Sequence, residues 1–366
     1  MQFLHPDYDQ QLELSLDDVF LLPGYSDAGS RSTVDLTPID FSGGSLPIVS
    51  ANMNAVTGKR MAETMARYGG LGVLPQDMEL STVARIVSHI KQADVRYDTP
   101  LVVTADAPLR DVRSIIRKRA HDMVIVVDAG NRPLGIITHA DLRDQDLYTQ
   151  ARQLMSQHMV TIEVDTSNRN AFALIEGERV QSAPVVDQQG HLLGVLSRDD
   201  AVRLDVLEPS LDQQGRLMVG AAVAISSEVS ERVQELLDLA IDFIVLDTAH
   251  GHQQQMIDAI VTARQVAGPK LPIVAGNVCT AEGTQALLAA GADVVKVNVG
   301  PGSMCTTRIQ TGVGRPTFSA VYHCAEEARR HGKHIWADGG VSLPRDVALY
   351  LAAGAARVMV GTLLAG

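Results

Sequence analysis

The sequence predicts an α/β protein in which eight parallel strands close into a (β/α)8 TIM barrel. Short apolar segments alternate with longer amphipathic segments, which is the pattern of a parallel sheet whose crossover connections are helices. Eight such units occur, and this number favours a closed barrel over an open doubly wound sheet. Residues 95–207 interrupt the alternation and contain an internal repeat. We therefore expect the barrel to be built from two parts, 1–94 and 208–366, around one inserted domain.

The expected strands are short and apolar, and several end in Gly, Asp or Asn, where a barrel presents its active-site loops. They are Pro47–Met53, Gly70–Leu74, Leu217–Ala222, Phe243–Asp247, Pro272–Ala275, Val294–Val299, His334–Ala337 and Val358–Gly361. Segments of helical length lie between them, at Glu228–Ala240, Gln253–Val266, Ala281–Ala290, Phe318–His331 and Arg345–Ala353.

The inserted stretch carries two copies of one pattern. Val126-Val127-Asp128 followed by Gly135-Ile136-Ile137-Thr138-His139-Ala140-Asp141 returns as Val185-Val186-Asp187 followed by Gly194-Val195-Leu196-Ser197-Arg198-Asp199-Asp200. The offset is 59 residues throughout (194 − 135 and 200 − 141), and no gap is needed. Duplication at this period implies two similar packed units, at about 95–148 and 149–207.

This pattern resembles a tandem pair of CBS motifs, which commonly bind adenine nucleotides or related ligands. The resemblance implies that Thr138 with Asp141, and Ser197 with Asp200, contact the ribose of an adenine or guanine nucleotide. The alternative is that these polar residues cap the helix that follows them. The sequence leaves both interpretations open.

The composition is that of a soluble globular protein, since 46% of the 366 residues are hydrophobic and 20% are charged. The net charge of −12 argues against an extended nucleic-acid-binding surface. The three cysteines, Cys279, Cys305 and Cys324, provide no disulfide framework and favour a cytoplasmic location. We expect neither a membrane-spanning segment nor a signal peptide.

One cysteine lies in a glycine-rich loop directly after an apolar strand. The loop reads Gly300-Pro301-Gly302-Ser303-Met304-Cys305-Thr306-Thr307-Arg308. A thiol on such a loop can approach an electrophile closely, and a nearby hydroxyl can handle protons. A single cysteine is more often a small buried apolar residue, but these neighbours favour a nucleophile. Thr307 has a plainer alternative role, a side-chain hydrogen bond that stabilises the turn.

This loop resembles the catalytic loop of the IMP dehydrogenase and GMP reductase family. The resemblance recurs at Pro47–Met53, Asp247–His252, Ala275–Val278, Ala337–Gly340 and Gly361–Gly366. It implies that Cys305 attacks C2 of a purine nucleoside monophosphate and forms a covalent thioimidate. It also implies that Thr307 assists the water or the leaving amine in the other half-reaction.

The same resemblance implies the remaining site residues. Met53 lines the purine pocket, Asp338 holds the ribose hydroxyls, and Asp247 and Asn277 contact the dinucleotide. The residue types at the strand ends suggest that the nucleotide phosphate is bound by one side-chain hydroxyl and by several backbone amides that no bulky side chain covers. These are provided by Ser303, Gly340, Gly361 and Thr362. The carbonyls of Gly300, Gly302 and Cys305 resemble a monovalent-cation site, such as one for potassium.

Two departures bear on the choice of activity. Ala51-Asn52-Met53 is more like GMP reductases, because dehydrogenases usually carry proline before this methionine, and Phe318-Ser319-Ala320-Val321 points the same way. The CBS pair is instead usual for the dehydrogenases. Asn54 and Asn298 replace residues that are commonly aspartate and glycine.

A CBS-containing GMP reductase branch resolves this conflict and implies NADPH as cofactor and a homotetramer or higher homo-oligomer. The alternatives are an NAD-dependent IMP dehydrogenase that makes XMP and an inactive nucleotide-sensing CBS protein. The chain stops at Gly366, just after the eighth strand, whereas this family normally continues into a flap. We therefore interpret the sequence as incomplete.

Overall fold

The computed structural model describes residues 12–30, 33–302 and 307–365. The chain divides into two compact units. The first contains the residues up to Gln92 and from Glu208 onwards, and the second is Ala93–Leu207. Each unit has its own hydrophobic core.

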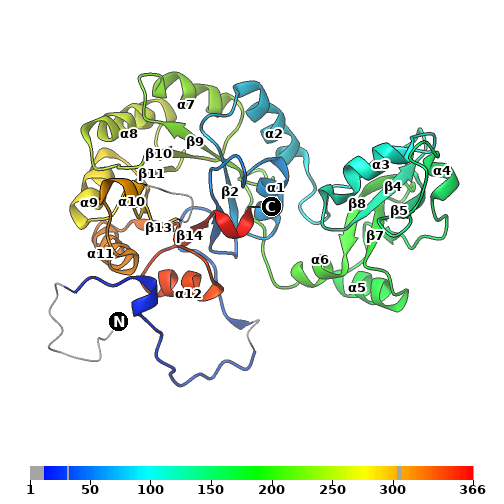
Figure 1. Cartoon of the computed structure of the whole chain (residues 1–366), viewed down its shortest axis with the longest axis horizontal. Helices are drawn as coiled ribbons and strands as arrows, with labels where there is room; N and C mark the ends of the chain where they lie inside the picture. The colour runs from blue at the N-terminus through cyan, green and yellow to red at the C-terminus, as the bar shows by residue number, and fades with distance from the viewer. Residues whose placement is uncertain (1–11, 31–32, 303–306, 366) are drawn as a thin grey trace. The chain divides into compact units, whose positions relative to one another are not determined.

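The first unit is a closed barrel of eight parallel strands, in the order β1-β14-β13-β12-β11-β10-β9-β2 (Figure 1). Its strands are β1 (Ile48–Ser50), β2 (Leu71–Leu74), β9 (Gly220–Ala224), β10 (Phe243–Asp247), β11 (Ile273–Val278), β12 (Val294–Val297), β13 (His334–Asp338) and β14 (Arg357–Val360). The predicted barrel and all eight of its strands are confirmed. Both bounds of β9 differ from the prediction, and this strand begins at Gly220 because Leu217 pairs with Leu211 outside the barrel.

Helices surround the barrel, as expected for crossovers between parallel strands (Figure 1). They are α1 (Lys59–Arg67), α2 (Leu80–Gln92), α7 (Val229–Asp238), α8 (Gln254–Ala267), α9 (Ala281–Ala290), α11 (Thr317–Arg330) and α12 (Pro344–Ala352), with shorter turns at η1 (Leu16–Asp18), α10 (Thr307–Thr311) and η4 (Thr362–Leu364). The five predicted helices all occur, each within two residues of its predicted bounds.

Aromatic rings and one buried ion pair close the end of the barrel where the strands begin. The Phe41 ring lies 5.5 Å from that of Phe243 and 6.1 Å from that of Trp336, measured between centroids. Arg357 and Asp40 are fully buried and pair at 3.0 Å, and Trp336 Nε1 donates to the same carboxylate oxygen at 2.9 Å. Side chains therefore fill this end of the barrel.

A second ionic cluster lies beside the points where the chain leaves and re-enters the barrel unit. Lys91 Nζ contacts Asp212 Oδ2 at 2.9 Å and both oxygens of Asp242 at 2.7 Å. The Val219 amide donates to Asp242 Oδ2 at 2.6 Å. These contacts join the end of α2 to the segment that returns from the inserted unit.

The second unit contains two three-stranded sheets of the same topology. Their elements are β3 (Val102–Thr104), α3 (Leu109–Ile115), η3 (Ile116–Lys118), β4 (Met123–Val127), β5 (Pro133–Thr138) and α4 (Ala151–Leu154), then β6 (Ile162–Glu163), α5 (Asn168–Gly177), β7 (Ser182–Val186), β8 (Leu192–Ser197) and α6 (Arg198–Arg203). In each sheet the first pair of strands is parallel and the second antiparallel.

The two sheets also share their register. Val126 pairs with Gly135, and at an offset of 59 Val185 pairs with Gly194. A register shift follows each of these pairs at the matching position. An apolar cluster that includes Ile125 and Val195 packs one copy on the other. The sequence repeat is therefore a repeat of structure, bulge included.

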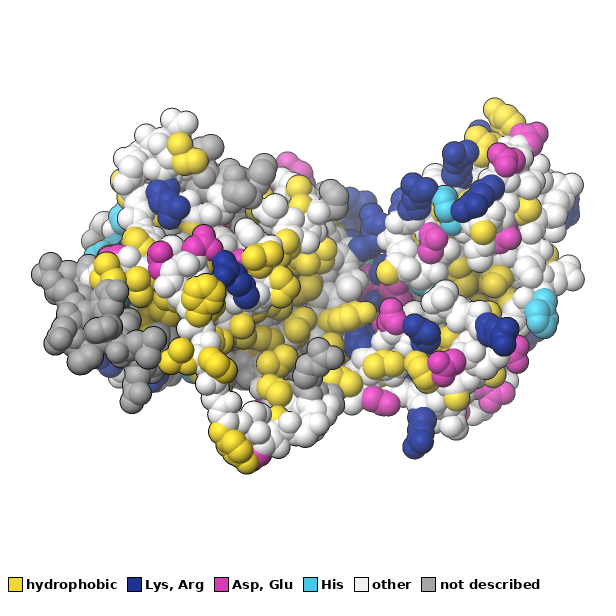
Figure 2. Space-filling view, turned by 60° about the horizontal axis from the view of Figure 1, so that its bottom comes forward, with side chains coloured by type: hydrophobic (Ala, Val, Ile, Leu, Met, Phe, Trp, Pro, Cys, Tyr) yellow, Lys and Arg dark blue, Asp and Glu magenta, His cyan; other side chains and the backbone are white. Residues whose placement is uncertain are grey.

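Hydrophobic side chains are visible on the surface of the barrel unit (Figure 2). The most exposed large ones in the segment before β1 include Phe20 and Tyr25, at 77% and 97% exposure. Contiguous exposed apolar surface often marks a contact with another molecule. Among the described residues, no helix is both long and apolar enough to span a bilayer.

Candidate active site

A cavity of about 580 Å³ opens at the end of the barrel where the strands finish. Loops after β1, β2, β10 and β12 contribute to its wall, together with Asn277 and Asp338 near the ends of β11 and β13. Six residues predicted from the sequence line it: Met53, Asp247, Asn277, Gly300, Thr307 and Asp338. This is the end where barrels present their functional groups, and the volume is typical of a small-molecule site.

A buried lysine lies at the centre of this wall. Lys296, on β12, is 2% exposed, and its Nζ lies 2.8 Å from Asp247 Oδ1 and 2.6 Å from Asp338 Oδ2. Burial alone would lower the pKa of Lys296, but the two carboxylates outweigh burial and raise it. The lysine is therefore an ammonium shared by the two aspartates at the ends of β10 and β13.

Asp247 is held on both of its oxygens. Lys296 binds Oδ1, and Asn52 Nδ2 donates to Oδ2 at 2.7 Å from the loop after β1. Burial would raise the pKa of Asp247, yet the Lys296 charge and these hydrogen bonds bring it below its ordinary value. Asp247 is therefore a carboxylate at neutral pH.

Asn277 links Asp338 to the start of the glycine-rich loop that follows β12. Its Nδ2 donates to Asp338 Oδ2 at 2.9 Å and to the Asn298 carbonyl at 2.8 Å. Asn298 has a φ of 109°, in the region that favours glycine, and donates through Nδ2 to Tyr350 Oη at 3.2 Å. Burial raises the pKa of Tyr350 to about 12, so the phenol stays protonated and donates in turn to the Gly339 carbonyl.

Two acceptor atoms beside this network have no hydrogen-bond partner within the described part of the chain. They are Oδ1 of Asn277 and Oδ1 of Asn298, and both are buried. Buried polar atoms are nearly always paired in folded proteins. The hydrogen bonds of the Nδ2 atoms thus fix both amide side chains. The two Oδ1 atoms remain able to accept hydrogen bonds next to the cavity.

The described part of the glycine-rich loop after β12 is tightly packed. Gly300 has a φ of 71°, and a Cβ there would lie 2.7 Å from Arg308 Cβ, so the loop needs glycine at this position. Thr307 begins α10 and lines the cavity. Arg308 packs against Gly300, in keeping with a structural role. Cys305 and Ser303 lie outside the described residues.

The glycines predicted to bind phosphate adjoin the cavity without lining it. A Cβ on Gly340 would meet Tyr350 Oη at 3.1 Å and Pro301 Cβ at 3.3 Å, so this glycine lies against the glycine-rich loop. A Cβ on Gly361 would meet Met53 Sδ at 3.2 Å, and Thr362 begins η4 directly after it. The ends of β13 and β14 therefore lie beside the opening of the cavity that Met53 lines. Gly302, from the predicted cation site, is likewise not part of the cavity wall.

The other two cysteines are in packed surroundings. Burial raises the pKa of the Cys279 thiol and raises that of Cys324 to about 12. Neither thiol is ionised at neutral pH, which is the behaviour of packing residues.

In the second unit, the candidate ribose-contacting pairs are hydrogen-bonded within themselves. Ser197 caps α6 by accepting from the Asp200 amide at 3.0 Å, and its hydroxyl donates to Asp200 Oδ2 at 2.6 Å. Thr138 Oγ1 donates to Asp141 Oδ2 at 2.7 Å, although a turn and not a helix follows it. The helix-capping interpretation therefore holds for Ser197, whereas Thr138 caps no helix.

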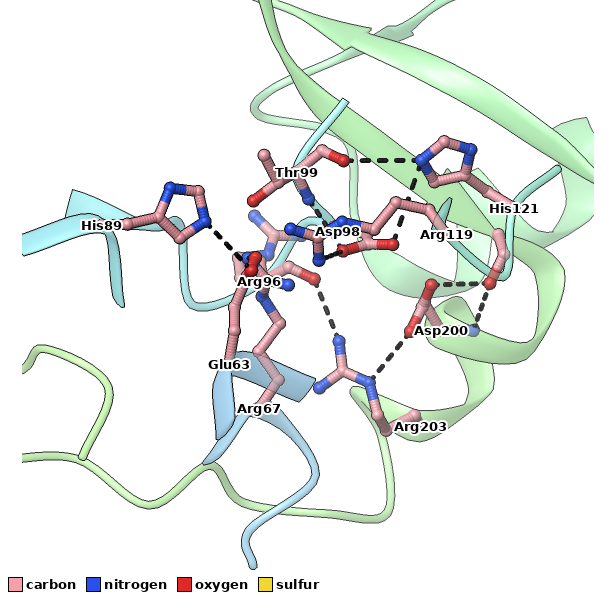
Figure 3. Close-up of polar contacts among 11 residues, drawn as sticks. Glu63, Arg67, His89, Arg96, Asp98, Thr99, Arg119, His121, Asp200 and Arg203 are labelled. Atoms are coloured by element: carbon pink, nitrogen blue, oxygen red, sulfur yellow. Dashed lines mark hydrogen bonds and ion pairs between the residues drawn. The ribbon is translucent and has the colours of Figure 1, made fainter. Parts of the chain in front are cut away.

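Basic side chains of this unit gather around its acidic ones (Figure 3). Arg119 Nη1 donates to Asp98 Oδ1 at 2.8 Å, and Arg203 Nε donates to Asp200 Oδ1 at 3.2 Å. His121 lies 4.0 Å from Asp98, and burial lowers its pKa, so the ring is neutral at pH 7. In the barrel unit, Glu63 is paired with Arg67 at 2.7 Å and with His89 at 3.1 Å.

A domain model for IMP dehydrogenase / GMP reductase matches residues 13–366. The chain belongs to the IMP dehydrogenase/GMP reductase family. Among its relatives, the GMP reductase of Mycobacterium tuberculosis (strain ATCC 25618 / H37Rv) is 47% identical over 371 residues, with 100% of this chain and 76% of the relative covered. The inosine-5'-monophosphate dehydrogenase of Bacillus subtilis (strain 168) is 39% identical over 362 residues, with 96% and 74% covered.

Solved structures of the family agree with the fold. A GMP reductase variant from Trypanosoma brucei in complex with guanosine 5'-monophosphate has a TM-score of 0.64 and 34% identity, over 97% of this chain and 77% of that one. The same enzyme in complex with guanosine 5'-triphosphate has a TM-score of 0.63 and 34% identity, over 97% and 87%. The family resemblance seen in the sequence is confirmed.

Sequence reasoning missed the residue at the centre of this family member's site. Lys296 stands in the apolar strand Val294-Val295-Lys296-Val297, and a lysine buried in such a strand must be paired. This position of Lys296 in the sequence could therefore have predicted a buried ion pair. The hydrogen bonds from Asn52 to Asp247 and from Asn298 to Tyr350 could not be predicted, because each joins a loop residue to an element far away in the chain.

Proposed function

We propose that this protein is a GMP reductase, which converts GMP to IMP and ammonia with NADPH as reductant. The observation that carries the choice is Asn52, whose Nδ2 donates to Asp247. The proline usual in dehydrogenases has no side-chain donor and could not make this bond. The higher identity to a GMP reductase (47%) than to a dehydrogenase (39%) supports the same choice.

In the proposed reaction, the Cys305 thiolate attacks C2 of GMP and the 2-amino group leaves as ammonia, which gives a thioimidate. Thr307, at the cavity wall, assists the protonation of the departing amine. Reduction at C2 then breaks the C–S bond and releases IMP. Ser303, Gly340, Gly361 and Thr362 would bind the phosphate, Asp338 the ribose and Met53 the purine.

The residues around Asp247 fit a nicotinamide cofactor. Asn52, Asp247, Thr248 and Asn277 form a polar stretch of the wall, and Asn277 Oδ1 has no partner among described residues. NADPH, when bound, supplies the hydride for C2. Asp247 and Asn277 would hold it, and the paired state of Asp247 keeps that carboxylate ionised and in place.

An IMP dehydrogenase activity is the second candidate, because several dehydrogenases align over almost the whole chain, inserted unit included. One experiment separates the two. The protein is incubated with GMP plus NADPH and, separately, with IMP plus NAD, and nicotinamide absorbance is followed. Loss of NADPH absorbance on GMP supports the proposal. NADH formation from IMP without NADPH consumption on GMP would replace it by the dehydrogenase.

We further propose that residues 95–207 are a tandem CBS pair, divided at about 148, that binds a purine nucleotide and modulates the barrel. The shared register and bulge of the two sheets support this. Thr138 with Asp141 and Ser197 with Asp200 would contact ribose. Calorimetric titration of the whole chain with ATP and GTP tests it, and heat that persists in an Asp141→Ala, Asp200→Ala double variant would argue against these residues.

The proposed enzyme would act in the cytoplasm as a homotetramer or larger homo-oligomer. The exposed apolar side chains before β1 support self-association. The carbonyls of Gly300, Gly302 and Cys305 would bind a monovalent cation such as potassium. Light scattering tests the assembly, and comparing rates in potassium and in a large organic cation tests the ion.

A further inference from the structure

We propose that Lys296 is a positioning residue that serves both halves of the pocket, holding Asp338 for the nucleotide and Asp247 for the dinucleotide. This inference rests on the proposed function, because it uses the roles given there to the two aspartates. Lys296 would contact neither ligand and would act only through these two carboxylates.

The placement of Lys296 in the barrel supports this role. β12 lies between β11 and β13, and β10 follows β11 in the barrel order. From β12 the lysine side chain reaches the aspartates at the ends of β10 and β13, at 2.8 and 2.6 Å. A Cβ on Gly276 would lie 2.7 Å from Lys296 Cβ, so the absence of a side chain on β11 makes room for the lysine to pass.

The hydrogen bonds fix the direction of each carboxylate. Asp338 Oδ2 accepts from Lys296 and from Asn277, and Oδ1 has no partner among the residues that the structure describes. Asp338 is therefore held with one oxygen occupied by protein donors and the other free to accept from a pair of ribose hydroxyls. Asp247 is held between Lys296 and Asn52.

The charges explain why a lysine is needed here. Two carboxylates that share one partner repel each other, because like charges at short range raise the energy of the pair. The Lys296 ammonium lies between them and attracts both. Without it, no cation would hold the two carboxylates in place, and their repulsion would turn them away from the directions that the ligands need.

The barrel offers a matched control. Lys91 is also buried, at 6% exposure, and also bridges two aspartates, Asp212 and Asp242. Asp242 and Asp247 bracket β10 five residues apart (247 − 242), so the two clusters are separated by about 16 Å along the strand. Lys91→Met therefore removes a comparable ion pair at the opposite end of the barrel, and none of its three residues lines the cavity.

The test is a double-mutant cycle on ligand affinity, measured by calorimetry on the full chain, with circular dichroism to monitor the fold. Lys296→Met should weaken GMP binding by about 10- to 100-fold, the effect of losing one or two hydrogen bonds to a charged group. In an Asp338→Asn background the same change should have little further effect on GMP. In the corresponding cycle for the cofactor, Lys296→Met should weaken NADPH binding in the wild-type background and have little further effect in an Asp247→Asn background. Lys91→Met should leave both affinities within about twofold.

Wild-type GMP affinity in a folded Lys296→Met variant would overturn the inference. So would independent, multiplicative losses from Lys296→Met and Asp338→Asn. If Lys296→Met alone does not fold, the Lys296→Met, Asp247→Asn double variant removes the unpaired charge and is compared with Asp247→Asn. Weaker GMP binding by the double variant supports the inference, and equal binding overturns it.

Failure of the proposed function would look different. A wild-type protein that binds GMP but oxidises no NADPH would count against the reductase reaction and leave the GMP cycle able to support or overturn the role of Lys296. Retention of tight GMP binding in the Lys296→Met variant, with normal wild-type turnover, would count against the role of Lys296 alone.

Discussion

Asp338→Asn tests the nucleotide-binding role of this aspartate with almost no change in volume. Asp338 Oδ2 accepts from Lys296 at 2.6 Å and from Asn277 at 2.9 Å. Both partners are donors, so the single oxygen of an asparagine should remain with them. Its NH2 group would then replace the outward Oδ1, and a position that accepts hydrogen bonds would become one that donates them.

The magnitude follows from that exchange. A hydrogen bond to a charged group contributes about 1.5–3 kcal/mol. Two such bonds to the ribose diol would be lost, and one hydroxyl could still accept from the new NH2 group. A net loss of about 2–3 kcal/mol corresponds to GMP binding weaker by about 30- to 150-fold.

Isothermal titration with GMP measures the loss directly, and thermal melting followed by circular dichroism shows whether the fold is kept. Asp212→Asn is the matched control, because it also removes a carboxylate bound to a buried lysine, at 2.9 Å, but at the other end of the barrel. An Asp338→Asn protein with a native melt and a GMP affinity within about threefold of wild type would refute the ribose role.

Three further predictions concern the thiols, the ion pairs and the barrel floor. Cys305→Ala should abolish turnover, while Cys279→Ala and Cys324→Ala should keep most of it. Iodoacetamide at about pH 8 should label Cys305 first, because burial raises the pKa of the other two thiols. Equal labelling of all three cysteines, read by mass spectrometry, would contradict this prediction. The lowered pKa of Asp247 should stabilise the fold fully above the ordinary value of 3.8 and lose that contribution as the pH falls through the lower folded value, so Asp247→Asn should flatten the acid limb of a denaturant-unfolding series. Arg357→Met should reduce the free energy of unfolding by about 3–5 kcal/mol, because it leaves the buried Asp40 carboxylate unpaired. An Arg357→Met, Asp40→Asn double variant that recovers none of that loss in chemical denaturation would show that the unpaired charge is not the cause.

The sequence was sufficient for the barrel because its strands are buried on both faces and read as apolar runs between amphipathic helices. Phe243–Asp247 and Ala281–Ala290 were placed without error for this reason. Strand ends were less certain where a loop residue takes over. β12 ends at Val297, because Asn298 leaves the extended region with a φ of 109°.

The site was predictable only in part. Asp247, Asn277 and Asp338 lie at or near the ends of strands, Met53 and Thr307 lie in the segments that follow strands, and parallel strands bring their ends to one edge. What joins these residues could not be read from the chain. The charge of a lysine in the middle of a strand, and an amide in the loop after β1, act across the barrel through contacts that depend on its closure.

The Lys91 cluster has a consequence for protein engineering. Lys91 Nζ lies 2.9 Å from Asp212 Oδ2, so the two cut ends left by removal of residues 93–207 would already be neighbours. A short flexible linker would span them at small entropic cost. The barrel can thus be regarded as a scaffold with one preformed grafting position, into which a foreign sensor domain could be spliced while the strand order of the barrel is kept.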